Sequence, residues 1–283
     1  MNKDILKSDL RICEWEEIDG QFILKLPKRP LEDYPAFKKW MVQLGGKYKK
    51  CTFVFDRSPK PEFDALMLEG KLVNPKKDFQ AFFTPASVVQ TMRDLVCADM
   101  METAKHNNNS LSALEPSAGV GNILFGISTL MQDINIHWEY CEIQMRNAMD
   151  LLNRSTELPI GHKAVYTFEP DFLQLPTTPN YQYNFVIGNP PYSKGQDITH
   201  TRKMVDHLKE GGKLCVVLPF GVLFNSSKKY KSFRKFFFGS EEPVHLDSKF
   251  KAIGQSRLTK LPEQSFKDSG TNIDLFILQY TKQ

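Results

Sequence analysis

The chain has 283 residues, of which 41% are hydrophobic and 25% charged, with a net charge of +4. These values fit one sizeable globular domain, or one such domain with a small appendage. No apolar run approaches the roughly 18 to 20 residues of a membrane span, and the first residues lack the apolar core of a signal peptide. The five scattered cysteines form no Cys-x-x-Cys pair, so we expect reduced thiols and no metal site. We expect a cytoplasmic location, no membrane partner, and a charge that permits a nucleic-acid partner.

Residues 1–75 are predicted to form a small α+β accessory module, and residues 76–283 a larger domain. A strand-like apolar run begins at Phe22, and a helix is expected over Tyr34–Leu44, with Gly45 and Gly46 as its stop. A second strand is expected over Thr52–Phe55. The module contains no recognisable catalytic constellation, so recognition, docking and a lid over the larger domain all remain open as its role.

The larger domain begins with Phe83-Thr84-Pro85, a cap signature that opens an amphipathic helix. A short apolar strand follows at Leu111–Leu114 and ends in Glu115-Pro116-Ser117-Ala118-Gly119-Val120-Gly121-Asn122. Two glycines at a strand-to-helix turn let the backbone approach a ligand closely, as in nucleotide-binding sheets. The third glycine of the dinucleotide pattern is absent. The loop therefore suits a methionine-linked nucleoside better than a dinucleotide.

Two acidic residues follow the next predicted strands. The strand expected over Ile134–Ile143 contains Glu142, at the offset from the glycine loop where an acid accepts the ribose hydroxyls of a bound nucleotide. Glu139 is the competing candidate, and Glu142 is preferred because it lies nearer the carboxyl end of the strand. A third strand, Ala164–Phe168, leads to Asp171-Phe172. By itself, Asp171 is equally suited to capping a turn or a helix.

The apolar run Tyr183–Ile187 ends in Asn189-Pro190-Pro191-Tyr192. The Asn189 side-chain oxygen and the Pro190 carbonyl can each accept one N–H of an exocyclic amino or amide group. That frees the nitrogen lone pair for attack on an electrophile. The prolines fix the backbone, and Tyr192 offers a flat face for a planar substrate. An ordinary proline turn that closes a buried strand is the simpler alternative.

The remainder predicts a helix over residues 198–209, stopped by Gly211-Gly212, and a strand over Lys213–Leu218. The segment from Gly221 to Lys260 then holds nine basic residues against three acidic ones. This excess indicates either a phosphate-contacting surface or a solvated helix face. A last strand is expected over Ile273–Tyr280.

The motifs at residues 83–85, 115–122 and 189–192 together resemble the adenine-N6 DNA methyltransferases that use S-adenosylmethionine. The resemblance extends over about Phe82 to Lys282 and includes Leu261-Pro262, Phe266 and Ser269-Gly270-Thr271, which look like the closing hairpin of these enzymes. It implies a doubly wound α/β fold with a mostly parallel, seven-stranded Rossmann-like sheet whose last strand is antiparallel. It also implies transfer of a methyl group to a flipped-out adenine of DNA, most readily double-stranded DNA.

The resemblance assigns roles to individual residues. The catalytic group is Asn189, Pro190, Pro191 and Tyr192. The residues implied in binding S-adenosylmethionine are Phe83, Thr84, Pro85, Glu115, Pro116, Ser117, Ala118, Gly119, Gly121, Asn122, Glu142, Asp171, Phe172 and Asn189. In the family, Asp171 would accept the adenine amino group of the cofactor. Tyr192 and a second aromatic, Phe224 or Phe220, would stack on the target base, and Lys228 and Lys229 would contact phosphates.

One departure from the family is the short segment between Tyr192 and the next strand, because full-size relatives usually carry a long target-recognition insert. Recognition would then come from residues 1–75, the basic segment or a separate specificity subunit, as in restriction-modification systems. Three alternatives stay open: an RNA amino-group methyltransferase, a protein glutamine methyltransferase, and a non-catalytic DNA-binding subunit of a modification complex.

Overall fold

The computed structural model describes residues 2–18, 21–56, 58–72, 83–267 and 273–283. The chain divides into two compact units, Met1–Ala81 and Phe82–Gln283. The motif residues Ser269-Gly270-Thr271 and the expected boundary after residue 75 lie outside the described residues.

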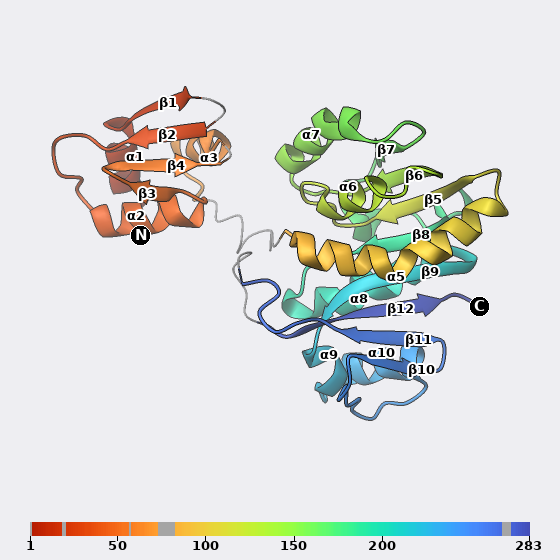
Figure 1. The fold of residues 1–283 in the computed structure, drawn as a ribbon. Coiled ribbons are helices and arrows are strands. Elements are labelled where there is room, and N and C mark those ends of the chain that lie inside the picture. Colours follow the sequence, from red (N-terminus) through yellow and green to blue (C-terminus); the bar gives the residue numbers. More distant parts are fainter. Residues whose placement is uncertain (1, 19–20, 57, 73–82, 268–272) are drawn as a thin grey trace. The chain divides into compact units, whose positions relative to one another are not determined.

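Within its described residues, the first unit pairs an antiparallel sheet, in the order β1-β2-β4-β3, with the helices α1, α2 and α3 (Figure 1). Leu24, Phe53 and Phe55 of the sheet pack with Trp40 and Leu66 of the helices in one buried cluster. The expected strands and central helix are present, and the prediction missed the other elements. The elements are α1 (Lys3–Arg11), β1 (Glu14–Ile18), β2 (Gln21–Lys25), α2 (Tyr34–Gln43), β3 (Lys47–Lys49), β4 (Thr52–Phe55) and α3 (Lys60–Glu69).

The second unit is an α/β domain around a mostly parallel sheet of eight strands, in the order β10-β11-β12-β9-β8-β5-β6-β7 (Figure 1). The strands are β5 (Ser110–Glu115), β6 (Asn135–Tyr140), β7 (Lys163–Tyr166), β8 (Tyr183–Gly188), β9 (Leu208–Pro219), β10 (Phe250–Ile253), β11 (Ser256–Lys260) and β12 (Leu275–Thr281). The helices are α5 (Ala86–Lys105), α6 (Asn122–Ser128), α7 (Met145–Arg154), α8 (Gln196–Asp206), α9 (Gly221–Phe224) and α10 (Lys228–Phe238).

The sheet confirms the doubly wound α/β fold class. Strands β5 to β9 pair in parallel, and β12 runs antiparallel to both β9 and β11, as expected for the last strand. The sheet has eight strands where seven were expected, because β10 pairs with β11 as a hairpin and extends one edge.

The predicted end of the helix over residues 198–209 is wrong. The helix that was expected to stop at Gly211-Gly212 ends at Asp206, and β9 already begins at Leu208. Gly211 has a φ of +71° and lies inside the strand, and the pairing of β8 with β9 shifts register between Tyr183 and Phe185. A glycine tolerates this left-handed backbone inside a strand irregularity. The two glycines therefore shape the strand and do not terminate the helix.

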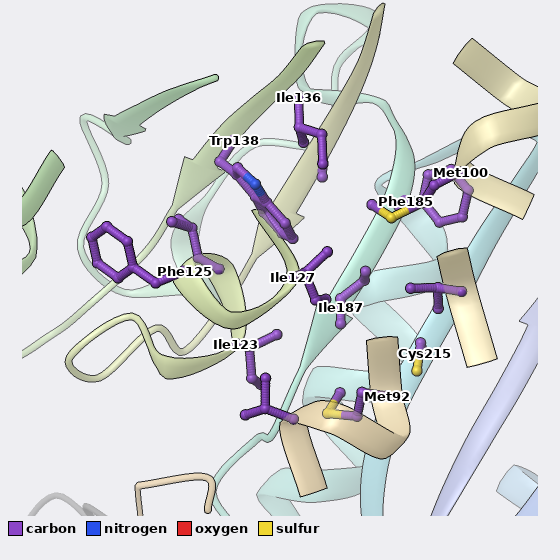
Figure 2. Packing of buried hydrophobic residues seen from close by; sticks show 14 of the residues in the cluster. Met92, Met100, Ile123, Phe125, Ile127, Ile136, Trp138, Phe185, Ile187 and Cys215 are labelled. Atoms are coloured by element: carbon purple, nitrogen blue, oxygen red, sulfur yellow. The ribbon is translucent and has the colours of Figure 1, made fainter. Parts of the chain in front are cut away.

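Two apolar layers cover the sheet. Helices α5, α6 and α7 pack on one face, where Trp138, Ile127 and Ile187 are fully buried (Figure 2). The indole N–H of Trp138 donates to the Ser128 hydroxyl at 2.9 Å, which satisfies a polar atom inside this layer. Helices α8, α9 and α10 cover the other face through a second buried cluster. Because both faces are covered, the central strands read as nearly continuous apolar runs.

Among the helices in the described parts of the chain, none is long and apolar enough to cross a membrane.

Replacement of Ile127 tests the packing of this core. Ile127→Ala removes a side chain that is 0% exposed between α6 and the sheet, and should lower the free energy of unfolding by about 2–5 kcal/mol. The nearby Leu130, which is 59% exposed, is the control, and Leu130→Ala should cost less than about 0.5 kcal/mol. Urea denaturation followed by fluorescence and circular dichroism measures both. Equal losses would contradict the placement of α6.

Candidate active site

The strand order places the candidate site at the point where the sheet reverses direction. From β5 the chain continues to β6 on one side, and it later returns to β8 on the other side of β5. In open α/β sheets, ligands bind beyond the carboxyl ends of the strands at such a switch point. The loop that begins at Pro116 follows β5, and Asn189 follows β8. A methyl group added at Gly188 would lie 3.1 Å from Pro116, so the two loop starts are in close contact.

The glycine loop has the backbone that its sequence predicts. Gly119 and Gly121 have φ values of +56° and +80°. A Cβ atom on Gly119 would lie 3.2 Å from the ring of Phe83, and one on Gly121 would lie 2.9 Å from Phe125. Both positions therefore require glycine for backbone conformation and for space. The loop leads directly into α6, which begins at Asn122.

Glu115 holds the first turn of that helix. Its carboxyl group is 1% exposed and accepts the backbone N–H of Leu124 at 3.0 Å. Burial raises the pKa of Glu115 well above its ordinary value, the Leu124 N–H opposes this rise, and the nearby Glu142 charge adds to it. Glu115 was predicted to contact a cofactor. Its observed contact is with α6, so it stabilises the first turn of the helix that follows the glycine loop.

Glu142 lies just beyond β6 and is tied to the glycine loop. Its two oxygens accept the backbone N–H groups of Gly119 at 2.7 Å and Gln144 at 2.8 Å. The competing Glu139 accepts the hydroxyl of Tyr183 at 2.9 Å inside the sheet. Of the two acids, Glu142 is therefore the one beside the loop.

Thr84 connects the remaining motifs. Its hydroxyl accepts the Nδ2–H of Asn189 at 3.2 Å, and its carbonyl accepts the Nδ2–H of Asn122 at 2.9 Å. Thr84 is 5% exposed, so these bonds are shielded from water. The Oδ1 atom of Asn189 accepts the hydroxyl of Tyr192. Three segments that are far apart in sequence thus meet at Thr84 and Asn189.

Asp171 and Phe172 have structural contacts of their own. The Asp171 carboxylate accepts the N–H of Leu173 at 3.0 Å and caps a short 3-10 turn, Phe172–Gln174. Phe172 is 2% exposed and packs against the rings of His200 and His207. Phe172 thus lies in the core under α8, with little surface for a ligand. The ligand-binding role of Asp171 stays a prediction.

The basic segment divides into surface and interior residues. Lys228 is exposed at the start of α10. Lys229, expected at phosphates, instead donates to the carbonyl of Gly195 and to the Thr199 hydroxyl at 2.8 Å. Arg234 is 1% exposed and donates to the carbonyls of Glu241, Val222 and Asn225. Part of the basic excess therefore stabilises the fold.

The two candidate stacking aromatics differ in exposure. Phe224 is 43% exposed and meets the ring of His245 edge-on. Phe220 is partly buried against Phe276, with Lys260 over its ring. Phe224 therefore has the more accessible face, and its role at a substrate stays a prediction.

Two exposed apolar residues beside the acids were missed. Ile143, next to Glu142, is 59% exposed, and Phe168, three residues before Asp171, is 67% exposed. Both were expected inside strands, but β6 ends at Tyr140 and β7 at Tyr166, which leaves them in the loops that follow. An apolar side chain beside a ribose-binding acid offers a surface for a planar heterocycle. For Ile143, the signal in the sequence was an apolar residue directly after an acid near a strand end.

No protein-family model matches the chain, and no curated protein sequence matches it significantly. Many solved structures are similar to this chain. A type I restriction-modification methyltransferase subunit from Streptococcus thermophilus shares 19% identity, with a TM-score of 0.49, over 71% of this chain and 45% of that one. The M protein of the type I restriction enzyme EcoKI shares 16%, with a TM-score of 0.49, over 88% and 54%.

A third similar structure is magnesium protoporphyrin IX methyltransferase from Synechocystis, solved with bound SAM. It shares 14% identity, with a TM-score of 0.43, over 80% of this chain and 92% of that one. The chain spans only about half the length of the two type I proteins. At these identities the assignment of fold class rests on the strand order of the chain itself.

The buried carboxyl of Glu115 generates a pH-dependent prediction. Because its pKa is raised in the folded state, its contribution to stability is present at low pH and is lost as the pH rises through the folded pKa. Glu115→Gln keeps an acceptor for Leu124 and removes the charge. The variant should therefore melt at a higher temperature than the wild type at pH 8, and the difference should shrink toward pH 4. Thermal unfolding across this range measures it, and a constant difference would contradict the assignment.

Proposed function

We propose that the chain is an S-adenosylmethionine-dependent methyltransferase that acts on the N6 amino group of adenine in DNA. The observation that carries this proposal is the position of Asn189-Pro190-Pro191-Tyr192. The motif follows β8 at the switch point of the sheet and is joined through Thr84 to the glycine loop. An ordinary proline turn would not require these links to two distant motifs.

The residues around the glycine loop fit a methionine-linked nucleoside. The two carboxylate oxygens of Glu142 each accept one backbone N–H and would accept the ribose hydroxyls with their remaining lone pairs, and Ile143 would offer an apolar surface for the base. At Gly119 the positive φ and the nearby ring of Phe83 both favour a residue without a side chain. Asp171 is the acceptor proposed for the adenine amino group of the cofactor. S-adenosylmethionine, when bound, supplies an electrophilic methyl group.

The catalytic motif would act on the nucleophile. Asn189 Oδ1 and the Pro190 carbonyl accept the two N–H groups of the target amino group and orient its lone pair. The two prolines hold these acceptors in place, so little reorganisation is needed during transfer. The ring of Tyr192, which packs against the apolar layer under α5 and α6, offers a stacking surface. Stacking offsets part of the few kcal/mol that flipping a base out of a duplex costs.

The choice of DNA as substrate rests on the motif resemblance and on charge. A hollow on α10 is lined by three lysines and two serines: Lys228, Lys231, Lys235, Ser226 and Ser232. One acidic residue, Glu241, also lines it. Three ammonium groups and two hydroxyls suit the phosphates of a nucleic-acid backbone. Only 15 residues, 193–207, separate Tyr192 from β9, which leaves little room for sequence recognition there. Residues 1–81 or a separate specificity subunit would provide it.

A radioactive methyl-transfer assay tests the substrate. Purified protein with labelled S-adenosylmethionine should incorporate label into unmodified duplex DNA, and digestion should yield N6-methyladenine. Incorporation into RNA or into protein glutamine, but not into DNA, would show that the protein is a methyltransferase with a substrate other than DNA. Binding of the cofactor without incorporation into any of the three would favour a non-catalytic subunit.

Asn189→Ala tests the catalytic assignment. The variant removes the acceptor oxygen of the target amino group, so kcat should fall by at least about 100-fold. The affinity for S-adenosylmethionine, measured by calorimetry, should change much less. Asn153→Ala, on the exposed side of α7, is the control and should leave kcat unchanged. An Asn189→Ala enzyme with wild-type turnover would refute the role.

The hollow on α10 generates a prediction about salt. Joint replacement of Lys228, Lys231 and Lys235 by Gln should weaken DNA binding for all sequences alike. It should also reduce the slope of log K against log salt by up to about 0.9 for each phosphate that a lysine no longer neutralises. Fluorescence anisotropy at several salt concentrations measures both. The control is Lys105→Gln together with Lys163→Gln, at exposed positions on α5 and β7. An unchanged slope would show that α10 does not contact phosphates.

A further inference from the structure

A buried carboxylate that closely follows the catalytic motif in the sequence has no role in the proposed methyl transfer. Asp197 lies in the first turn of α8, five residues after Tyr192, and is 1% exposed. Within the part of the chain that the structure describes, neither carboxylate oxygen has a hydrogen-bond partner of good geometry, although the Ile198 N–H lies close enough to stabilise the charge. A buried charged group without a partner costs free energy, so a protein that retains one commonly uses it in another state.

Tight backbone geometry holds Asp197 next to the motif. Lys194 and Gly195 both have left-handed φ values, +54° and +71°, and turn the chain from the motif directly into α8. Lys229 of α10 fixes this turn through the Gly195 carbonyl and Thr199. Asp197 lies between these two anchored residues in the sequence, so its position relative to the motif is constrained.

The groups near Asp197 identify its partner. Burial raises the pKa of Asp197 to about 6, and the Ile198 N–H and the Lys229 ammonium oppose that rise. The Asp197 charge in turn adds to the burial that raises the pKa values of Tyr192 and Tyr230. Of these two phenols, Tyr192 belongs to the catalytic motif.

The Tyr192 hydroxyl is hydrogen-bonded to the same oxygen atom that would accept the target amino group. It donates to Oδ1 of Asn189, which is the acceptor assigned to the target amino group. When an adenine enters, this hydroxyl must release Asn189 and find another acceptor, because an unpaired buried hydroxyl is costly. The Asp197 charge acts on the Tyr192 hydroxyl, and among the described residues neither Asp197 oxygen has a hydrogen-bond partner of good geometry.

We propose that Asp197 is a positioning residue that accepts the Tyr192 hydroxyl when the target amino group takes its place on Asn189. This inference rests on the proposed function of Asn189. In the resting enzyme the hydroxyl protects the Asn189 acceptor, and in the substrate complex it moves to Asp197. The carboxylate thereby holds the stacking ring in its working position without touching the substrate.

A double-mutant cycle tests the proposal, with Asp197→Asn and Tyr192→Phe alone and combined. Asp197→Asn should lower kcat for DNA methylation about tenfold, because that loss corresponds to the net free energy of roughly one hydrogen bond. In the Tyr192→Phe background, which retains the ring but has no hydroxyl to place, the same change should have less than about a twofold effect. The control is Asp206→Asn at the exposed end of α8, which should leave kcat unchanged in both backgrounds.

The pH profile supplies a second readout. In the wild type, kcat should fall below about pH 6 as Asp197 becomes protonated and accepts less strongly. This fall in kcat at low pH should be absent from the Tyr192→Phe and Asp197→Asn variants. Equal losses in both backgrounds, or no loss in either, would overturn the role of Asp197 and leave the methyltransferase intact. Failure of the wild-type enzyme to methylate any substrate would instead refute the proposed function.

A stability measurement is independent of activity. Asp197→Asn removes a buried charge, so the variant should melt at a higher temperature than the wild type at pH 8, above the raised pKa. The advantage should vanish near pH 4, where both side chains are neutral. An Asp197→Asn variant that is less stable than the wild type at pH 8 would show that the carboxylate already has a stabilising partner, and would overturn the proposal.

Discussion

The architecture of the candidate site depends on the pair of hydrogen bonds that two asparagine side chains donate to Thr84. One comes from Asn189 after β8, and the other from Asn122 at the start of α6. Because Thr84 is almost completely buried, these bonds exchange little with water and fix the distance between two loops of the sheet. The segment before α5 therefore acts as the connection between the glycine loop and the catalytic motif.

The carboxyl groups near the sheet edge have separate functions because their surroundings differ. Glu115 is 1% exposed and holds α6, whereas Glu142, which is also buried at 7% exposure, accepts the backbone N–H groups of Gly119 and Gln144. Glu139 is held by Tyr183 within the sheet. Asp197 closely follows Tyr192 in the sequence and has no hydrogen-bond partner of good geometry among the described residues. Residue type alone does not separate these roles, since all four are acids near strand ends or helix starts.

The basic residues of α10 also have separate functions. Arg234, in the interior, and Lys229, at the surface, both donate to backbone carbonyls, whereas Lys228, Lys231 and Lys235 present their charges at a surface hollow. A guanidinium group with several donors can satisfy three carbonyls at once, which explains why an arginine is tolerated at 1% exposure. The positive charge available to a nucleic acid is thus smaller than the sequence count of residues 221–260 indicates.

The sequence by itself determined the fold class, the antiparallel last strand and the order of the motifs. Apolar periodicity and glycine placement are local properties, and Gly119 and Gly121, both with positive φ, lie at the strand-to-helix turn where the pattern predicted one. Only the tertiary structure decided which polar atoms meet. The Thr84 bonds, the burial of Phe172 and Arg234, and the isolation of Asp197 depend on contacts between segments up to 105 residues apart. Local patterns carry no information about such contacts, because they arise only when the strands are ordered in the sheet.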